Sequence, residues 1–173
     1  MASVSLYFIR HGIAAERGTY ANDAERPLTD EGRKKTRQVA KRLHELGLRF
    51  DLLITSPLVR AEQTAAIFQA TAHDTAKYDL PVQVSEFLAP DRNFTDWFDR
   101  FQQNLKQQSG NRAIGLVGHE PDLSAWAEIL VWGEVRSILV LKKAGVIGLS
   151  LPEQDSPIGN SLLFLLIPPK LLI

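Results

Sequence analysis

Four residues of this chain could together bind and attack a phosphoryl group: Arg10, His11, Arg60 and His119. An unprotonated imidazole is a nucleophile, and guanidinium groups donate paired hydrogen bonds to phosphate oxygens. Gly12 follows His11 and lets the backbone turn sharply, or lets a ligand come close, because it has no side chain. If these residues meet, they predict a pocket for a compact dianion and a histidine that attacks phosphorus.

The elements that would position these residues are short apolar runs, the pattern of strands covered on both faces. Ser56 and Pro57 predict the cap and first residue of a helix, which places Arg60 in the first helical turn. Because neighbouring parallel strands end at one crevice, we expect the four side chains to meet there. The runs cover residues 6–9, 51–55 and 113–117.

Helical periodicity alternates with these runs along the chain. Thr29 is the predicted cap of a helix over residues 30–46, and Gly47 ends it. This alternation predicts an α/β fold, a three-layer α/β/α sandwich with a mainly parallel central sheet. With 173 residues, the chain is expected to form a single domain over residues 1–173. Further helices are predicted to start near residues 57, 94 and 121, and further strands at 82–84, 146–151 and 162–167.

The composition excludes several classes of function. Twenty basic residues balance twenty acidic ones, so no overall field attracts nucleic acid or a membrane surface, and we expect neither as a partner. The chain has no cysteine, which excludes disulfides, thiolate metal sites and cysteine-nucleophile phosphatases. Neither a leader pattern nor a long apolar segment is evident, and the expected location is cytoplasmic.

Metal and serine chemistry are the main alternatives for two histidines beside polar residues. A metal site normally adds a carboxylate or thiolate, and Arg10 and Arg60 would repel the cation, so we expect no metal and no cofactor. No serine is bracketed by glycines as the strained nucleophile turn requires. The remaining histidines, His44 and His73, are expected to be solvated.

Three segments of the chain together resemble the histidine phosphatase, or phosphoglycerate mutase-like, superfamily. They are the run Arg10 to Gly12, the run from Ser56 to Thr64, and Gly118 with His119. The run Arg26-Pro27-Leu28-Thr29 and the short chain are most similar to its SixA branch of phosphohistidine phosphatases.

This resemblance implies roles for individual residues. His11 would be the nucleophile that becomes transiently phosphorylated, while Arg10, Arg60 and His119 would hold the phosphoryl oxygens. Arg26 matches a further arginine on the phosphate side of the SixA pattern, and Asp23 matches a polar residue near the pocket, so both are predicted to bind phosphate or substrate.

One position departs from the mutase pattern. Mutases carry an acidic glutamate two residues after a leucine, and here Pro90 follows Leu88 at that spacing. An alcohol needs a proton to leave, whereas a phosphorylated imidazole can leave as a neutral ring, so the missing acid favours a phosphoramidate substrate. Glu86 and Glu120 are the carboxylates that could replace that acid, although Glu120 also fits a helix cap.

The resemblance therefore implies a metal-independent phosphohistidine phosphatase. Its expected substrate is a phosphorylated protein such as a histidine phosphotransfer domain, and its product is inorganic phosphate. The first alternative is a phosphatase for small phosphomonoesters that uses Glu120 or Glu86 as the acid. The second, from another class, is a noncatalytic module that binds phosphate.

Overall fold

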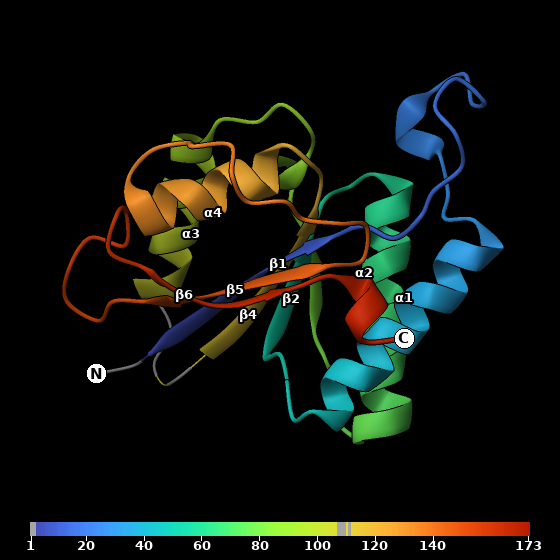
Figure 1. Cartoon of the computed structure of the whole chain (residues 1–173), viewed down its shortest axis with the longest axis horizontal. Coiled ribbons are helices and arrows are strands. Elements are labelled where there is room, and N and C mark those ends of the chain that lie inside the picture. Colours follow the sequence, from blue (N-terminus) through green and yellow to red (C-terminus); the bar gives the residue numbers. More distant parts are fainter. Residues whose placement is uncertain (1–2, 107–109, 111) are drawn as a thin grey trace.

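The computed structural model describes residues 3–106, 110 and 112–173, and it is built around a six-stranded sheet (Figure 1). The strand order is β3-β2-β4-β1-β5-β6, and the pairs among β1 to β4 are parallel. β5 runs antiparallel to both of its neighbours, so the sheet is mainly parallel, as predicted. The strands are β1 (Val4–Arg10), β2 (Leu52–Thr55), β3 (Val82–Val84), β4 (Arg112–Gly118), β5 (Val146–Leu151) and β6 (Leu162–Ile167).

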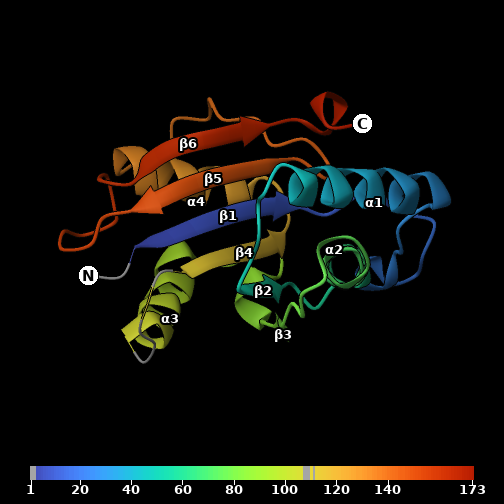
Figure 2. The same ribbon diagram turned by 90° about the horizontal axis from the view of Figure 1, so that it is seen from below.

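Helices cover both faces of this sheet. α1 (Asp30–Glu45) and α2 (Val59–Thr71) lie on one face, and α3 (Phe94–Lys106) and α4 (Asp122–Trp132) lie on the other (Figure 2). This arrangement confirms the predicted three-layer α/β/α sandwich. Short helical turns complete the fold: η1 (Asp23–Glu25), η2 (Ala72–Ala76), η3 (Glu86–Leu88) and η4 (Pro169–Leu171).

Strand β1 contributes to the hydrophobic core on both faces, because its side chains alternate between them. Leu6 and Phe8 face α3 and α4, where Trp97 and Trp126 stack with ring centroids 4.8 Å apart. Ile9 faces α1 and α2 in the second core. Every residue from 6 to 9 is buried, so the strand that ends at Arg10 is held firmly from both sides.

Helix α1 begins where the sequence predicts. The Thr29 hydroxyl accepts a hydrogen bond from the Gly32 N–H at 3.0 Å, and Gly47 ends the segment with a φ of +86°. The apolar stripe is one residue shorter than predicted, because Leu46 is the residue that caps the helix and is 60% exposed.

Helix α2 begins later than predicted. Its first residue is Val59 rather than Pro57, and Ser56 is not the cap residue. The prediction for His44 is also wrong, because this ring is 6% exposed and its Nδ1 lies 3.0 Å from the carbonyl oxygen of Leu48. His73 is solvated, as predicted. Among the helices of the described residues, none is long and apolar enough to cross a membrane.

Candidate active site

The ends of β1, β2 and β4 lie side by side and bring the candidate residues together. Arg10 pairs with Gly118 in the parallel ladder, and the His11 N–H donates to the Gly118 carbonyl at 3.1 Å. The Ser56 N–H donates to the Val117 carbonyl at 2.9 Å, which fixes the end of β2 beside that of β4. His11 and His119 are far apart in the sequence. In the structure the centroids of their rings lie 5.2 Å apart.

The His11 ring is oriented by the residue that follows it. Its Nδ1 lies 2.7 Å from the Gly12 carbonyl oxygen. A carbonyl oxygen only accepts hydrogen bonds, so Nδ1 carries the proton and Nε2 of a neutral ring keeps its lone pair. The orientation thus leaves Nε2 as the nitrogen that can act as a nucleophile.

Burial keeps His11 neutral. The side chain is 7% exposed, and the pKa of His11 is lowered to about 3, first by desolvation and then by the nearby His119, Arg60 and Arg10. The hydrogen bond to the Gly12 carbonyl opposes this shift, but it does not offset the loss of solvation. At neutral pH the ring is therefore uncharged.

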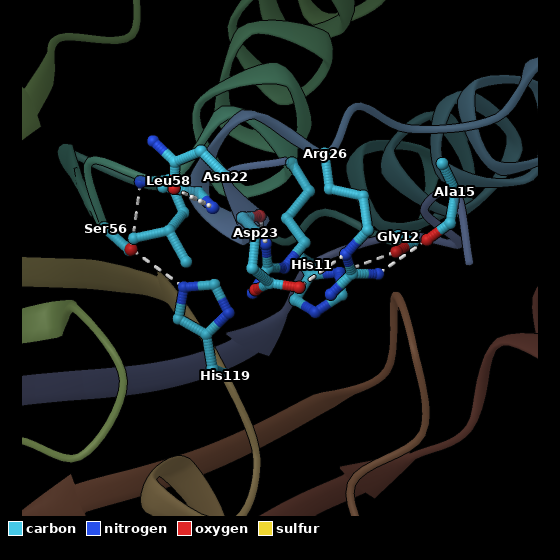
Figure 3. Close-up of polar contacts among 11 residues, drawn as sticks. His11, Gly12, Ala15, Asn22, Asp23, Arg26, Ser56, Leu58 and His119 are labelled. Carbon is cyan, nitrogen blue, oxygen red and sulfur yellow. Dashed lines mark hydrogen bonds and ion pairs between the residues drawn. The ribbon is translucent and has the colours of Figure 1, made fainter. Parts of the chain in front are cut away.

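His119 is held from the other side of the site. Its Nε2 lies 2.8 Å from the Ser56 hydroxyl oxygen. Figure 3 marks this contact with a dashed line. The other ring nitrogen, Nδ1, is buried without a partner in the described part of the chain. Burial and the positive charges of Arg60 and Arg10 lower the pKa of His119 to about 3. If the Ser56 hydroxyl donates to Nε2, Nδ1 carries a hydrogen that is free to bind an anion.

Arg10 is tied to the loop that precedes β5. Its guanidinium donates from Nη1 to the Leu141 carbonyl at 3.0 Å. The N–H of Ala144 donates to the carbonyl oxygens of Arg10 at 3.0 Å and of His11 at 3.2 Å. The loop therefore fixes both the side chain of Arg10 and the backbone that carries the two residues.

Asp23 joins the other two arginines. Its carboxylate accepts from Arg26 Nε at 2.9 Å, and Figure 3 shows these two side chains together. The carboxylate also accepts from Arg60 Nη2 at 3.0 Å, and the Asp23 carbonyl oxygen accepts from Arg60 Nη1 at 2.9 Å. The hydrogen bond from Arg26 keeps the pKa of Asp23 below its usual value, against the effect of desolvation. Arg26 and Arg60 are buried, with 6% and 3% exposed. A carboxylate in this position orients the two arginines.

Three buried N–H groups of the candidate residues have no hydrogen-bond partner within the described residues. They belong to Arg10 Nε, Arg60 Nε and, in the tautomer above, His119 Nδ1. Buried donors are normally paired, so an exception needs an explanation. An oxyanion bound among these side chains would supply acceptors for them.

Gly12 is required by packing. Its N–H donates to the Thr64 hydroxyl at 3.0 Å, and a Cβ added at this position would lie 2.3 Å from the Thr36 hydroxyl oxygen. The glycine thus allows α1 to approach the end of β1 closely. Its φ is not in the left-handed region, so the close approach is the reason for a glycine here.

The two candidate acids differ in their surroundings. Glu120 lies near Arg10, just before α4, and its carboxylate accepts from the N–H of Ser124 in the first turn of that helix at 3.1 Å and from the Ser124 hydroxyl. Burial raises the pKa of Glu120. Glu86 lines a cavity beside Trp97 and Arg100, and none of the four candidate residues lines that cavity.

The described part of the chain contains no group of three histidine, cysteine or acidic side chains that could bind a metal ion. The site instead gathers two neutral imidazoles and three arginines, with one carboxylate that bonds two of the arginines. Such a set of donors suits a tetrahedral oxyanion.

Comparison with known proteins places this chain in a family. The model of the histidine phosphatase superfamily, branch 1, matches residues 6–122. The chain belongs to the histidine phosphatase superfamily. An uncharacterized protein of Picosynechococcus sp. is 43% identical over 174 residues, covering 98% of this chain and 99% of that protein.

Solved structures of phosphatases share the fold of this superfamily member. The protein histidine phosphatase SixA, complexed with tungstate, matches with a TM-score of 0.79 at 23% identity, over 98% of this chain and 99% of that chain. A phosphoserine phosphatase from Entamoeba histolytica, in complex with 3-phosphoglyceric acid, matches with a TM-score of 0.65 at 18% identity, over 98% and 100%. The superfamily and the SixA-like fold are as predicted.

The sequence did not predict the roles of two residues at the site of this histidine phosphatase superfamily member. Ser56 was assigned to a helix cap, but its hydroxyl bonds to His119. Thr64 was quoted only as part of a motif, but its hydroxyl accepts from the Gly12 N–H and donates to the Arg60 carbonyl at 2.8 Å. The position of Ser56 directly after a buried strand was the available indication, because site residues gather at such ends.

Proposed function

We propose that this protein is a metal-independent phosphohistidine phosphatase that acts through a phosphohistidine intermediate on His11. Its substrate would be a phosphorylated protein such as a histidine phosphotransfer domain, and its product inorganic phosphate. Residues 1–173 would act as one domain. The observation that carries the proposal is the orientation of His11, whose Nδ1–H bonds to the Gly12 carbonyl and leaves Nε2 free among arginines.

In the first step, Nε2 of His11 attacks the phosphorus atom and the bond from phosphorus to the substrate nitrogen breaks. The ring of His11 gains positive charge as the new bond forms, and the Gly12 carbonyl stabilises that charge through the Nδ1–H. Arg10, Arg60 and His119 would donate to the phosphoryl oxygens, where negative charge is held during transfer. Arg26 would support Arg60 through Asp23.

In the second step, water attacks the phosphorus atom and the bond to His11 Nε2 breaks. Both protons of the water leave with the phosphate as dihydrogen phosphate, the electron pair of the broken bond stays on Nε2, and His11 returns to the neutral tautomer. The substrate imidazole leaves in the first step as a neutral ring when its other nitrogen carries a hydrogen, so no enzyme acid is required.

Two features support a phosphohistidine over a phosphate ester. Pro90 stands where mutases of this superfamily have an acid. Glu86, which could replace that acid, lines a cavity to which none of the four candidate residues contributes. The likeness in fold to SixA, a protein histidine phosphatase, agrees with this choice.

The surroundings of Glu120 favour a second candidate function, a phosphatase for small phosphomonoesters. Its raised pKa suits a general acid, and it lies near Arg10. The phosphoserine phosphatase with a similar fold agrees with an ester substrate.

Turnover of a phosphoramidate and of an alkyl phosphate separates the two functions. We expect wild-type protein to hydrolyse phosphohistidine with the higher kcat/KM, and His11→Ala to lose the activity. Glu120→Gln should retain phosphohistidine turnover, because the leaving ring needs no proton from the enzyme. A higher kcat/KM for the alkyl phosphate, lost in Glu120→Gln, would instead establish the second function.

A further inference from the structure

A groove of about 870 Å³ opens on the side of Arg10 that faces away from His119 along the sheet, toward β5 and β6. Its walls come from the first turns of α1, the loop before β5, and the C-terminal segment that follows β6. Figure 1 shows that C-terminal segment beside α1, and Figure 2 agrees. Arg10 belongs both to the candidate site and to this groove, so the two spaces share a wall.

The groove carries a concentrated positive charge. Four lysines line it in addition to Arg10, and none of the described residues that line it is acidic. Lys35 is paired with Glu31, one turn earlier on α1, at 2.6 Å. The remaining three make no ion pair within residues 3–106 and 112–173, and they are Lys142, Lys143 and Lys170.

This charge is local, because the chain as a whole has a formal net charge of zero. Lys143 shows how strongly the charges act on one another. Its pKa is lowered, first by partial burial and then by Arg10, Arg26 and Arg17. The groove and the phosphate side of the site therefore form one positive region. An anionic partner bound there would reduce the repulsion among these charges.

Apolar side chains lie exposed among these lysines. Val140 is 61% exposed, Leu166 is 44% exposed and Ile173 is 50% exposed, and all three line the groove. Exposed apolar groups that adjoin one another mark a surface that binds a partner. Together with the lysines, they match a partner segment that presents both acidic and apolar side chains.

We propose that this groove docks an acidic segment, with apolar side chains of its own, from the phosphorylated protein whose phosphohistidine reaches His11. The inference rests on the proposed function and names the surface by which the protein substrate is recognised. The unpaired lysines come from two separate parts of the chain, the loop before β5 and the C-terminal turn, so an occupant of the groove contacts both. Through the shared wall at Arg10, a segment held in the groove lies next to the end of β1.

Charge reversal tests the proposal. The double variant Lys142→Glu with Lys170→Glu changes two cations of the groove whose side chains make no hydrogen bond or ion pair to the candidate site residues within residues 3–106 and 112–173. Its matched control is Lys34→Glu with Lys41→Glu, which makes the same charge change on exposed residues of α1 outside the groove. The substrates are a panel of phosphorylated histidine phosphotransfer domains and free phosphohistidine.

For the best domain of the panel, we expect the ratio of its kcat/KM to that of free phosphohistidine to fall about tenfold in the groove variant. The control should change this ratio by less than about twofold. An unchanged ratio in the groove variant, or an equal fall in the control, would overturn the inference while leaving the phosphatase function intact.

A binding measurement keeps the two proposals separate. The Kd of unphosphorylated, fluorescently labelled domains is measured by anisotropy with wild type and both double variants. If no domain is dephosphorylated, the proposed function fails, but a tenfold weaker Kd in the groove variant alone would still support docking. The docking proposal would be overturned by equal Kd values in the three proteins or by binding of no domain. It would also be overturned if the groove only joins two copies of this chain.

Discussion

The hydrogen bond between His11 and the Gly12 carbonyl is the contact on which the chemistry depends at the scale of single residues. The sequence alone predicts a histidine after a buried strand, but not which ring nitrogen is free. That choice follows from the backbone conformation after β1, which directs the Gly12 carbonyl toward Nδ1 at 2.7 Å. Burial among arginines then keeps the ring neutral and nucleophilic.

The two buried histidines make the stability of the protein depend on pH. In the folded protein the pKa of His119 is about 3, while in an unfolded chain a histidine has a pKa of about 6.5. Between these values the unfolded state binds more protons, so stability is lost as the pH falls below about 6.5. Each such histidine lowers the free energy of unfolding by about 2 kcal/mol between pH 7 and pH 5.

We therefore expect the variant His119→Gln to lose less stability than wild type over the same pH range, by about 2 kcal/mol. Urea unfolding at the two pH values measures the difference. The readout is the change with pH, so a constant loss of stability from the substitution does not affect it. Parallel pH dependence in the two proteins would show that the ring of His119 is not buried as a neutral group.

At the scale of elements, the loop between α4 and β5 is held by one buried carboxylate. Glu128 is 1% exposed and accepts four backbone N–H groups, each at 2.6 or 2.7 Å. The same loop continues to Leu141, whose carbonyl holds Arg10. Glu128 therefore positions the site although it lies outside it. The four N–H groups belong to Arg136, Ser137, Ile138 and Leu139.

The variant Glu128→Gln should destabilise the protein by about 3 kcal/mol, because an amide nitrogen would face N–H donors that then lose their acceptor. The matched control is Glu134→Gln in the same loop, an exposed residue whose carboxylate accepts from Arg136 Nε at 3.1 Å. We expect it to change stability by less than about 0.5 kcal/mol. Denaturant unfolding of both variants checks this, and equal losses would contradict the assigned role of Glu128.

The wrong predictions from the sequence also concern elements. Rules for helix starts and for exposed residues use only neighbouring residues, whereas the structure also depends on contacts between segments. Ser56 followed by Pro57 has the composition of a helix start, but the chain continues for two more residues before α2 begins. This delay directs the Ser56 hydroxyl to His119. His44 lies on the helix face that packs against Phe50, which follows it closely in the sequence, and against Tyr78, which comes from a distant segment.

At the scale of the whole molecule, the sequence was sufficient to predict the three layers and the convergence of the strand ends. Continuous apolar runs indicate strands buried on both faces, and parallel neighbours place their carboxyl ends together. The sequence could not predict that Asp23 joins Arg26 and Arg60, because that depends on the path of an irregular segment. The groove beside Arg10 was equally out of reach, since its walls come from distant segments.

The central position of β1 gives a prediction for the stability of the whole fold. Phe8 is 0% exposed and packs against Trp97, whereas Phe164 on the edge strand β6 is 50% exposed. We expect Phe8→Ala to cost about 3 to 5 kcal/mol, through lost burial and a cavity, and Phe164→Ala to cost about 1 kcal/mol. Equilibrium unfolding compares the two truncations, and a similar cost at both positions would disagree with this account of the core.

The most direct measurement for the central claim is a rapid-quench experiment with a phosphohistidine substrate labelled in its phosphoryl group. We predict that label passes through an acid-labile, base-stable phosphate on the peptide that contains His11, at a rate no slower than turnover. His11→Ala should form no such species and should not turn over. Label on the His119 peptide, or full turnover by His11→Ala, would contradict the account.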